Sequence, residues 1–166
     1  MFPEMRRKRQ QLSREEAEAV LTRGTSGVLA VAGADGYPYA VPLSYVYQNG
    51  KLWFHCAKSG HKLDAIRRED KASFCVIDQD QVAPEEYTTY FRSAIAFGRV
   101  RILEDAGEIQ AAIDLLARRY APGDSREHRQ AVIRREAGAM YMLELTVEHL
   151  TGKEAKELRL ARREEP

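Results

Sequence analysis

The sequence predicts a mainly β fold with flanking helices, in which six or seven antiparallel strands form a closed or nearly closed barrel. Several short runs between residues 27 and 150 alternate apolar with polar residues, as half-buried strands do. The dipeptides Asp35-Gly36 and Asn49-Gly50 separate consecutive runs, and such dipeptides accept the positive φ of tight hairpin turns. Closure into a barrel removes the exposed edges that this many strands would otherwise leave.

The first two helices are predicted from local signals at their ends. Ser13, with Glu16 three residues later, is a capping box, and Gly24 ends the helix that it starts. Ser59 is placed to cap a second, short helix over 61–70. Two more helices are predicted by apolar residues at helical spacing, over 105–120 and 125–136.

Strands are predicted where the alternation has a period of two, at 27–33, 38–47, 51–57, 71–78, 87–103 and 139–150. The run 87–103 is too long for one flat strand and Gly98 is a natural bend, so we expect two strand segments there. Pro42 has no N–H to donate to a central ladder. Its strand is therefore expected at an edge, or beside backbone groups that are free to contact a flat polar ligand.

Length and composition favour one domain over residues 1–166, with an ordered core at about 12–153 and charged, solvated tails on either side. Lys and Arg number 26 against 25 Asp and Glu. This balance gives no reason to expect a nucleic-acid or membrane partner. The sequence shows no secretion signal and no apolar run long enough to cross a bilayer, so we expect a cytoplasmic protein.

The strongest candidate site lies where the strand 51–57 gives way to the short helix. In the turn between them, Gly60 allows a ligand to approach the backbone closely. His61 and Lys62 then add positive charge at a helix start whose N–H groups are unpaired. Cations at this end oppose the helix dipole, so a bound anion such as a phosphate would offset their cost. In the plainer interpretation, Gly60 only forms a turn and Lys62 is solvated.

Three segments of the chain resemble the pyridoxamine 5'-phosphate oxidase-like FMN-binding split-barrel family: YPYAVPLSYVY (37–47), WFHCAKSGHKLDAIRR (53–68) and YFRSAIAFGRVRILED (90–105). The chain looks most similar to the nitroimidazole-resistance (Nim-type) flavoprotein branch. The resemblance implies FMN as the cofactor and a homodimer that holds it near the subunit interface. It also implies a flavin-dependent oxidoreductase that passes electrons to a small flat acceptor such as a nitroimidazole.

The resemblance further implies a set of cofactor-binding residues from separate parts of the chain. They are Val41, Pro42, Leu43 and Ser44 beside the isoalloxazine, His55, Cys56 and Ala57 along its other edge, His61 and Lys62 at the phosphate, Arg92 and Ser93 from the second subunit, and Thr151 and Lys153. His55 matches the histidine to which the branch assigns a functional role, and it is the catalytic candidate. The C-terminal part lacks the Trp- and Arg-rich frame of vitamin B6 oxidases, which disfavours pyridoxamine-phosphate oxidation.

Several alternatives stay open. A flavin store or sensor without turnover would need the same residues, and the same barrel can hold haem or a deazaflavin. His55, Cys56, His61 and Cys75 are all possible ligands of zinc or iron. A metal site is disfavoured, because His55 and Cys56 are strand neighbours that point to opposite faces. Both cysteines are expected to be free, buried thiols. The tyrosines that share one strand face are expected to pack or to form dimer-interface area: Tyr39, Tyr45 and Tyr47.

Overall fold

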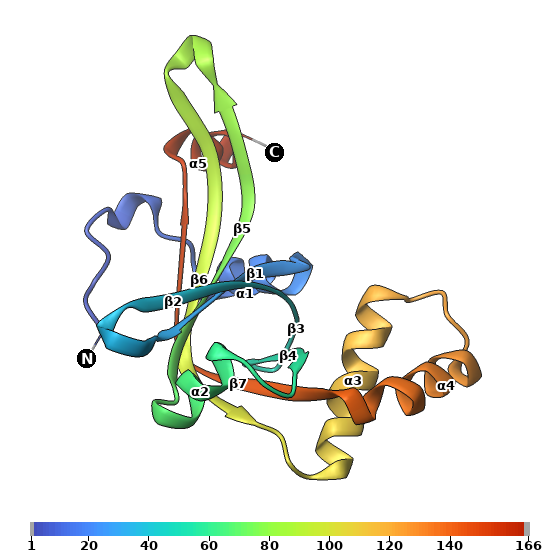
Figure 1. Ribbon diagram of the computed structural model, residues 1–166. Coiled ribbons are helices and arrows are strands. Elements are labelled where there is room, and N and C mark those ends of the chain that lie inside the picture. Colours follow the sequence, from blue (N-terminus) through green and yellow to red (C-terminus); the bar gives the residue numbers. More distant parts are fainter. Residues whose placement is uncertain (1, 165–166) are drawn as a thin grey trace.

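The computed structural model describes residues 2–164, and in them a mainly β fold with flanking helices is confirmed (Figure 1). The strands are β1 (Ser26–Ala32), β2 (Pro38–Ser44), β3 (Val46–Gln48), β4 (Lys51–Ala57), β5 (Lys71–Ala83), β6 (Thr88–Ile102) and β7 (Met140–Glu154). The helices are α1 (Arg14–Arg23), α2 (His61–Arg68), α3 (Ala106–Tyr120), α4 (Arg126–Glu136) and α5 (Lys156–Glu164). None of these helices has the length and apolar character needed to span a membrane.

One antiparallel sheet contains all seven strands, in the order β2-β1-β5-β6-β7-β4-β3. The two outer strands, β2 and β3, follow each other in the chain with only Tyr45 between them. The sheet must therefore curl until its two edges meet. No ladder joins β2 to β3 within residues 2–164, so the barrel is split along this seam.

Tyr45 fills the seam and ties a helix to it. Its ring is fully buried, and its hydroxyl donates a hydrogen bond to the Leu21 carbonyl at 2.7 Å. Its backbone N–H donates to the hydroxyl of Tyr120, the last residue of α3, at 2.9 Å. The Tyr120 hydroxyl in turn donates to the Thr25 carbonyl. Burial raises the pKa of Tyr45, which keeps its hydroxyl a neutral donor. Tyr120 thus connects α3 to both sides of the seam.

The hydrophobic core has two parts. The first lies inside the barrel and includes Phe54, Phe74 and Tyr45. The second lies between the outer face of β4 and β7 and the helices α3 and α4, and it includes Leu116 and Met142. The two helices therefore cover the outer face of the sheet at one end only, and they project from the barrel beside β7 (Figure 1). Tyr39 and Tyr47 pack against the first core, which confirms that these tyrosines serve packing.

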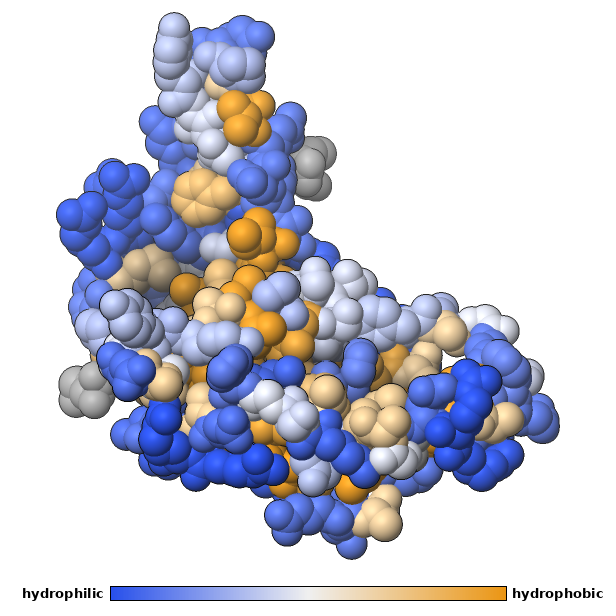
Figure 2. All heavy atoms as spheres, in the orientation of Figure 1, coloured by the Kyte–Doolittle hydropathy of each residue, from blue (hydrophilic) through white to orange (hydrophobic). Residues whose placement is uncertain are grey.

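β5 and β6 continue past the barrel as a long hairpin arm, defined here as residues 77–93 (Figure 1). The arm carries exposed hydrophobic side chains: Ile77 is 66% exposed, Val82 is 68% exposed and Tyr87 is 98% exposed. Hydrophobic residues are visible along the arm and at its base in Figure 2. Isolated exposed apolar residues are common, but a row of them on one arm is typical of a surface that another chain covers.

The local signals at helix ends and turns are largely confirmed. The Ser13 capping box is present, with both of its hydrogen bonds. In the two tight turns, Asp35 and Asn49 adopt φ values of 54° and 50°, each followed by a glycine with positive φ. The strand that contains Pro42 is an edge strand. Cys56 and Cys75 are free, but only Cys56 is buried and Cys75 is half-buried, because Cys75 lies on the outer face of β5.

Two expectations about the chain ends and the long strand are wrong. Residues 88–102 form one continuous strand and not two segments, because a register shift at Phe97 and Gly98 absorbs the bend. A Cβ at Gly98 would collide with the Thr146 carbonyl across the ladder, so glycine is needed there. Residues 156–164 are not a solvated tail but the helix α5, which packs against β6.

Candidate functional site

The end of β4 presents His55 and Cys56 to opposite sides of the sheet, as the alternation predicted. Cys56 points into the barrel and is 5% exposed, whereas His55 lies on the outer face and is exposed. Burial raises the pKa of the Cys56 thiol, and the nearby Lys62 charge only partly opposes this shift. A thiol with a raised pKa is a poor nucleophile, so Cys56 is a packing residue.

The start of α2 has no side-chain cap. The N-cap residue is Gly60 with φ 128°, so the prediction that Ser59 caps this helix is wrong. The Gly60 carbonyl accepts from the N–H groups of Leu63 and Asp64. The N–H groups of the two residues before them, at the first turn, have no partner within the helix. By contrast, serine or aspartate side chains cap α1, α3 and α4.

Two cationic residues stand at this uncapped helix start. Lys62 is half-buried and His61 is exposed, with the His61 ring 6.2 Å from the ring of Tyr39. The ion pair of α2 among the described residues joins Arg67 to Asp64 at 3.5 Å and leaves Lys62 out. A Cβ built at Gly60 would meet nothing within 4 Å, so the space beside the Gly60 backbone is open. Free amides, an ammonium group and open space together fit a phosphate.

A cavity of about 260 Å³ opens beside this junction, on the outer face of the sheet. Ser44 at the end of β2 and His55 on β4 form one wall, and side chains of α3 and α4 form the opposite wall. Ser44 is exposed on the same outer face as Pro42, whereas Val41 and Leu43 point into the barrel. The structure therefore brings Ser44 and His55 to one cavity. Val41 and Leu43 can offer only backbone groups to a ligand there.

The remaining candidates lie elsewhere on the outer face. Ser93 on β6 pairs directly with Lys153 on β7, and Thr151 lies two residues before Lys153 on the same face. The ammonium of Lys153 lies 5.2 Å from the centre of the Phe91 ring. Ser93, Thr151 and Lys153 therefore form a second group, separate from the first group at His55 and α2.

The strand register gives the separation between the second group and the edge strand β2. One row of paired residues crosses the sheet from Pro42 through Val28, Cys75 and Ile95 to Thr151. Its four steps of about 4.8 Å each amount to about 19 Å along the sheet. Thr151 therefore shares the outer face with Pro42 but lies four strands away from it along the sheet.

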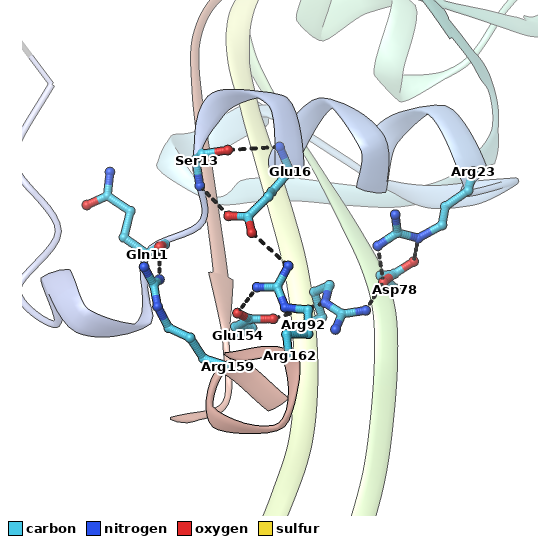
Figure 3. A network of polar contacts seen from close by, with 9 residues as sticks. All are labelled: Gln11, Ser13, Glu16, Arg23, Asp78, Arg92, Glu154, Arg159 and Arg162. Atoms are coloured by element: carbon cyan, nitrogen blue, oxygen red, sulfur yellow. Dashed lines mark hydrogen bonds and ion pairs between the residues drawn. The ribbon is translucent and has the colours of Figure 1, made fainter. Parts of the chain in front are cut away.

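Arg92 differs from the rest of the second group, because it points to the opposite face of β6 from Ser93. Its guanidinium lies 3.2 Å from Asp78 and 3.2 Å from Glu154, whose side chain is fully buried (Figure 3). Arg162 of α5 also binds Glu154, and Arg23 of α1 binds Asp78. Arg92 thus holds β5, β6 and β7 together at the base of the hairpin arm.

No group of three or more metal-binding side chains occurs in the part of the chain that the structure describes. His55 and Cys56 lie on opposite faces of β4. Cys75 lies on the outer face of β5, and the strands β6 and β7 separate β5 from β4.

Comparisons with known proteins identify the fold family. The family model for pyridoxamine 5'-phosphate oxidase matches residues 13–154. The chain belongs to the pyridoxamine 5'-phosphate oxidase family. Within this family fold, it is similar to a solved structure of a candidate 5-nitroimidazole antibiotic resistance protein from Bacteroides thetaiotaomicron. The identity is 21% and the TM-score 0.71, over 86% of this chain and 85% of that chain.

Two mycobacterial structures are similar over most of their length. A conserved hypothetical protein from Mycobacterium tuberculosis has 19% identity and a TM-score of 0.77, over 93% of this chain and 92% of that one. An FAD and haem binding protein from Mycobacterium smegmatis has 25% identity and a TM-score of 0.71, over 92% of this chain and 80% of that one. A comparison with curated proteins finds no match.

The sequence analysis missed the helical wall of the cavity. Residues of α3 and α4 were expected only as apolar packing faces, and nothing in their spacing indicates a gap between the helices and β4. The hydrogen bonds of Tyr120 were missed as well, because they join residues that are 75 and 95 positions apart in the chain. Contacts between residues so far apart in the chain leave no signal in the local sequence.

Proposed function

We propose that the protein binds FMN and acts as an FMN-dependent oxidoreductase that reduces a small flat acceptor, of which a nitroimidazole is one example. The observation that carries this proposal is the uncapped start of α2, where His61 and Lys62 stand beside free amides and open space. Membership of the pyridoxamine 5'-phosphate oxidase family, and similarity to a protein described as binding FAD and haem, support a flavin at this position.

Each part of the cofactor has a matching set of groups. The phosphate fits the amides of α2 and the ammonium of Lys62, because charge-assisted hydrogen bonds to a dianion are strong. The ring system fits along the backbone of 41–44, since β2 is an edge strand with unpaired groups on its outer side. When bound, the isoalloxazine supplies reversible two-electron redox chemistry. The side chain of His55 then lies where it can orient an acceptor or deliver a proton to it.

A homodimer completes the site in this proposal. Thr151 of the second group, which also contains Ser93 and Lys153, lies about 19 Å along the sheet from Pro42 of the same chain, so we assign the second group to the cofactor of a second copy. The outer face between the groups is apolar and open: Val28 is 38% exposed and Ile77 is 66% exposed. Burial of such a face against its own copy would also cover the hairpin arm.

Pyridoxamine-phosphate oxidation fits the C-terminal arginines poorly. Arg159 donates to the Gln11 carbonyl at 2.5 Å. Arg162 is bound between Glu16 and the buried Glu154. Because both guanidinium groups hold α5 in place, they are not free to bind the phosphate of a substrate.

The test is a titration of the purified protein with FMN and with riboflavin, which lacks the phosphate. Lys62→Ala is expected to weaken FMN binding by about 10- to 150-fold, because a charge-assisted hydrogen bond contributes about 1.5–3 kcal/mol. Riboflavin binding should stay the same. Lys58→Ala is the matched control, since the Lys58 ammonium lies over the Tyr141 ring at 5.7 Å and outside the proposed phosphate position.

Three results would contradict the proposal. If the purified protein takes up no FMN, FMN is not its cofactor. If Lys62→Ala weakens FMN and riboflavin binding equally, Lys62 does not bind the phosphate. An absorption spectrum of haem or of a deazaflavin in the purified protein would show that this group, and not FMN, is the cofactor. Turnover is tested separately, by oxidation of reduced nicotinamide with a nitroimidazole present, and a rate no higher than that of free FMN would leave a flavin store or sensor.

A further inference from the structure

We propose that the cavity between the sheet and the helices α3 and α4 binds the electron acceptor, and that it selects neutral, flat, mainly apolar molecules of one or two rings. The identification of the ligand as an electron acceptor rests on the proposed function. The binding of neutral, flat molecules by the cavity does not depend on it.

The walls are apolar and well fixed. Met142 on β7 is fully buried, Ile133 on α4 is 2% exposed and Leu116 on α3 is 9% exposed. These three residues belong to the second hydrophobic core and also line the cavity. A cavity whose walls are core residues keeps its shape, so it can discriminate by fit.

The charges at the cavity exclude anions. Of the residues that line it in the described part of the chain, only His55, Glu136 and Tyr120 carry ionisable side chains. The Tyr120 hydroxyl is already hydrogen bonded to the seam, and the Glu136 carboxylate is paired with Arg135 at 2.7 Å. No lysine or arginine lines the cavity. A carboxylate or phosphate would lose its hydration here without gaining a lysine or arginine partner, whereas a neutral ring loses little.

Polar recognition is limited to one side. Ser44 and His55 are on the sheet wall, and the helical wall opposite them presents mainly apolar side chains. A flat molecule with a carbonyl or nitro oxygen at one edge can therefore accept a hydrogen bond from this wall while its ring contacts α3 and α4. The volume of about 260 Å³ is below the range of about 300–1,000 Å³ that drug-sized ligands occupy. One or two fused rings fit this space better than a larger molecule.

Ala117 offers a way to fill the cavity without touching the proposed cofactor position. It is half-buried on α3 and lines the cavity, so Ala117→Leu adds apolar volume directly where the ring would lie. Val132→Phe fills the cavity from α4 and serves as an independent second variant. Ala131→Leu is the matched control, because Ala131 is exposed on α4 beside Val132 and does not line the cavity.

The experiment is isothermal titration of the FMN-loaded protein with two probes of the same ring system. Menadione is neutral, and 1,4-naphthoquinone-2-sulfonate carries a negative charge. Menadione is expected to bind at least about tenfold more tightly than the sulfonate, a difference of about 1.4 kcal/mol. Ala117→Leu and Val132→Phe should each weaken menadione binding by about tenfold or more. Ala131→Leu should bind menadione as the unchanged protein does.

The outcomes separate this inference from the proposed function. If menadione binds equally well to Ala117→Leu and Val132→Phe, both folded by their melting temperatures, or if the sulfonate binds as tightly as menadione, the cavity is not the binding site. If the protein takes up no FMN, the proposed function fails. The probes are then titrated into the protein as purified, and menadione binding that depends on residues 117 and 132 still supports the neutral pocket.

Discussion

Replacing Glu154 with glutamine should loosen the attachment of both α5 and the hairpin arm to the barrel. Glu154 is the last residue of β7, and its side chain is fully buried. One carboxylate oxygen is 3.2 Å from Nε of Arg92, and the other binds Arg162. The full set of charges is balanced, with three arginines and three carboxylates: Arg23, Arg92, Arg162, Glu16, Asp78 and Glu154 (Figure 3). The substitution leaves this set with one uncompensated positive charge.

The expected cost follows from the partners that remain. Removal of one member of a buried ion pair costs about 3–5 kcal/mol. Glutamine keeps the volume and one acceptor oxygen. In addition, Arg92 keeps Asp78 at 3.2 Å and Arg162 keeps Glu16 at 2.7 Å. We therefore expect a loss of about 2–3 kcal/mol, which corresponds to a fall in melting temperature of about 4–12 °C for a chain of this length.

The assay is thermal and urea unfolding of the unchanged protein and of Glu154→Gln, each at the same FMN content, because a bound ligand adds stability of its own. Glu148→Gln is the control: it removes a carboxylate from an ion pair with Arg99 at 3.1 Å, in which both side chains are about half exposed. Such surface pairs contribute about 0–1 kcal/mol. If Glu154→Gln loses no more stability than Glu148→Gln, the network does not hold α5 and the arm.

Two further predictions concern catalysis and pH. His55→Ala should change the free energy of unfolding by no more than about 0.5 kcal/mol, because the side chain is exposed. If the imidazole delivers the proton, the same variant should reduce the acceptor about 10²–10⁴-fold more slowly. Unchanged kinetics would show that His55 does not have this role. Burial alone would raise the pKa of Asp78, but its bonds to Arg23 and Arg92 outweigh burial and lower that pKa. This stabilisation is therefore fully present above the ordinary carboxyl pKa, and unfolding measured in steps down to about pH 2 should show it being lost below about pH 4, but not in Asp78→Asn.

Local signals predicted most of the fold. Capping residues, glycine turns and strand alternation each act over a few residues, and Ser13, Asp105 and the turn at Asn49 behave as expected. The failures concern elements that depend on distant partners. The charged segment 156–164 is a helix whose Arg162 binds Glu16 and Glu154, and no pattern within the segment itself reports those partners.

The same distinction explains the candidate site. The grouping of Gly60, His61 and Lys62 at one helix start was predicted because these residues are consecutive, and their binding of a phosphate stays a prediction. Even there the detail was wrong, since a serine next to a glycine looks like a cap until the backbone is known. The two groups across the sheet, at His55 and at Lys153, were predicted as residues through the family resemblance. The separation of about 19 Å along the sheet between Pro42 and Thr151 depends on strand order, which one sequence does not state.

The cavity wall marks the limit of both kinds of inference. The proposed phosphate position is encoded by one short segment, whereas the proposed acceptor cavity depends on how the sheet and the α3–α4 pair meet. These two layers are encoded by segments far apart in the chain, so substitutions on α3 and α4 can change the size of the cavity without disturbing Lys62 or β2. A shared α2 segment is thus compatible with different acceptors in different members of the family. Under the two proposals made above, residues 117 and 132, rather than the turn at Gly60, are therefore the positions to compare when asking which acceptor the cavity selects.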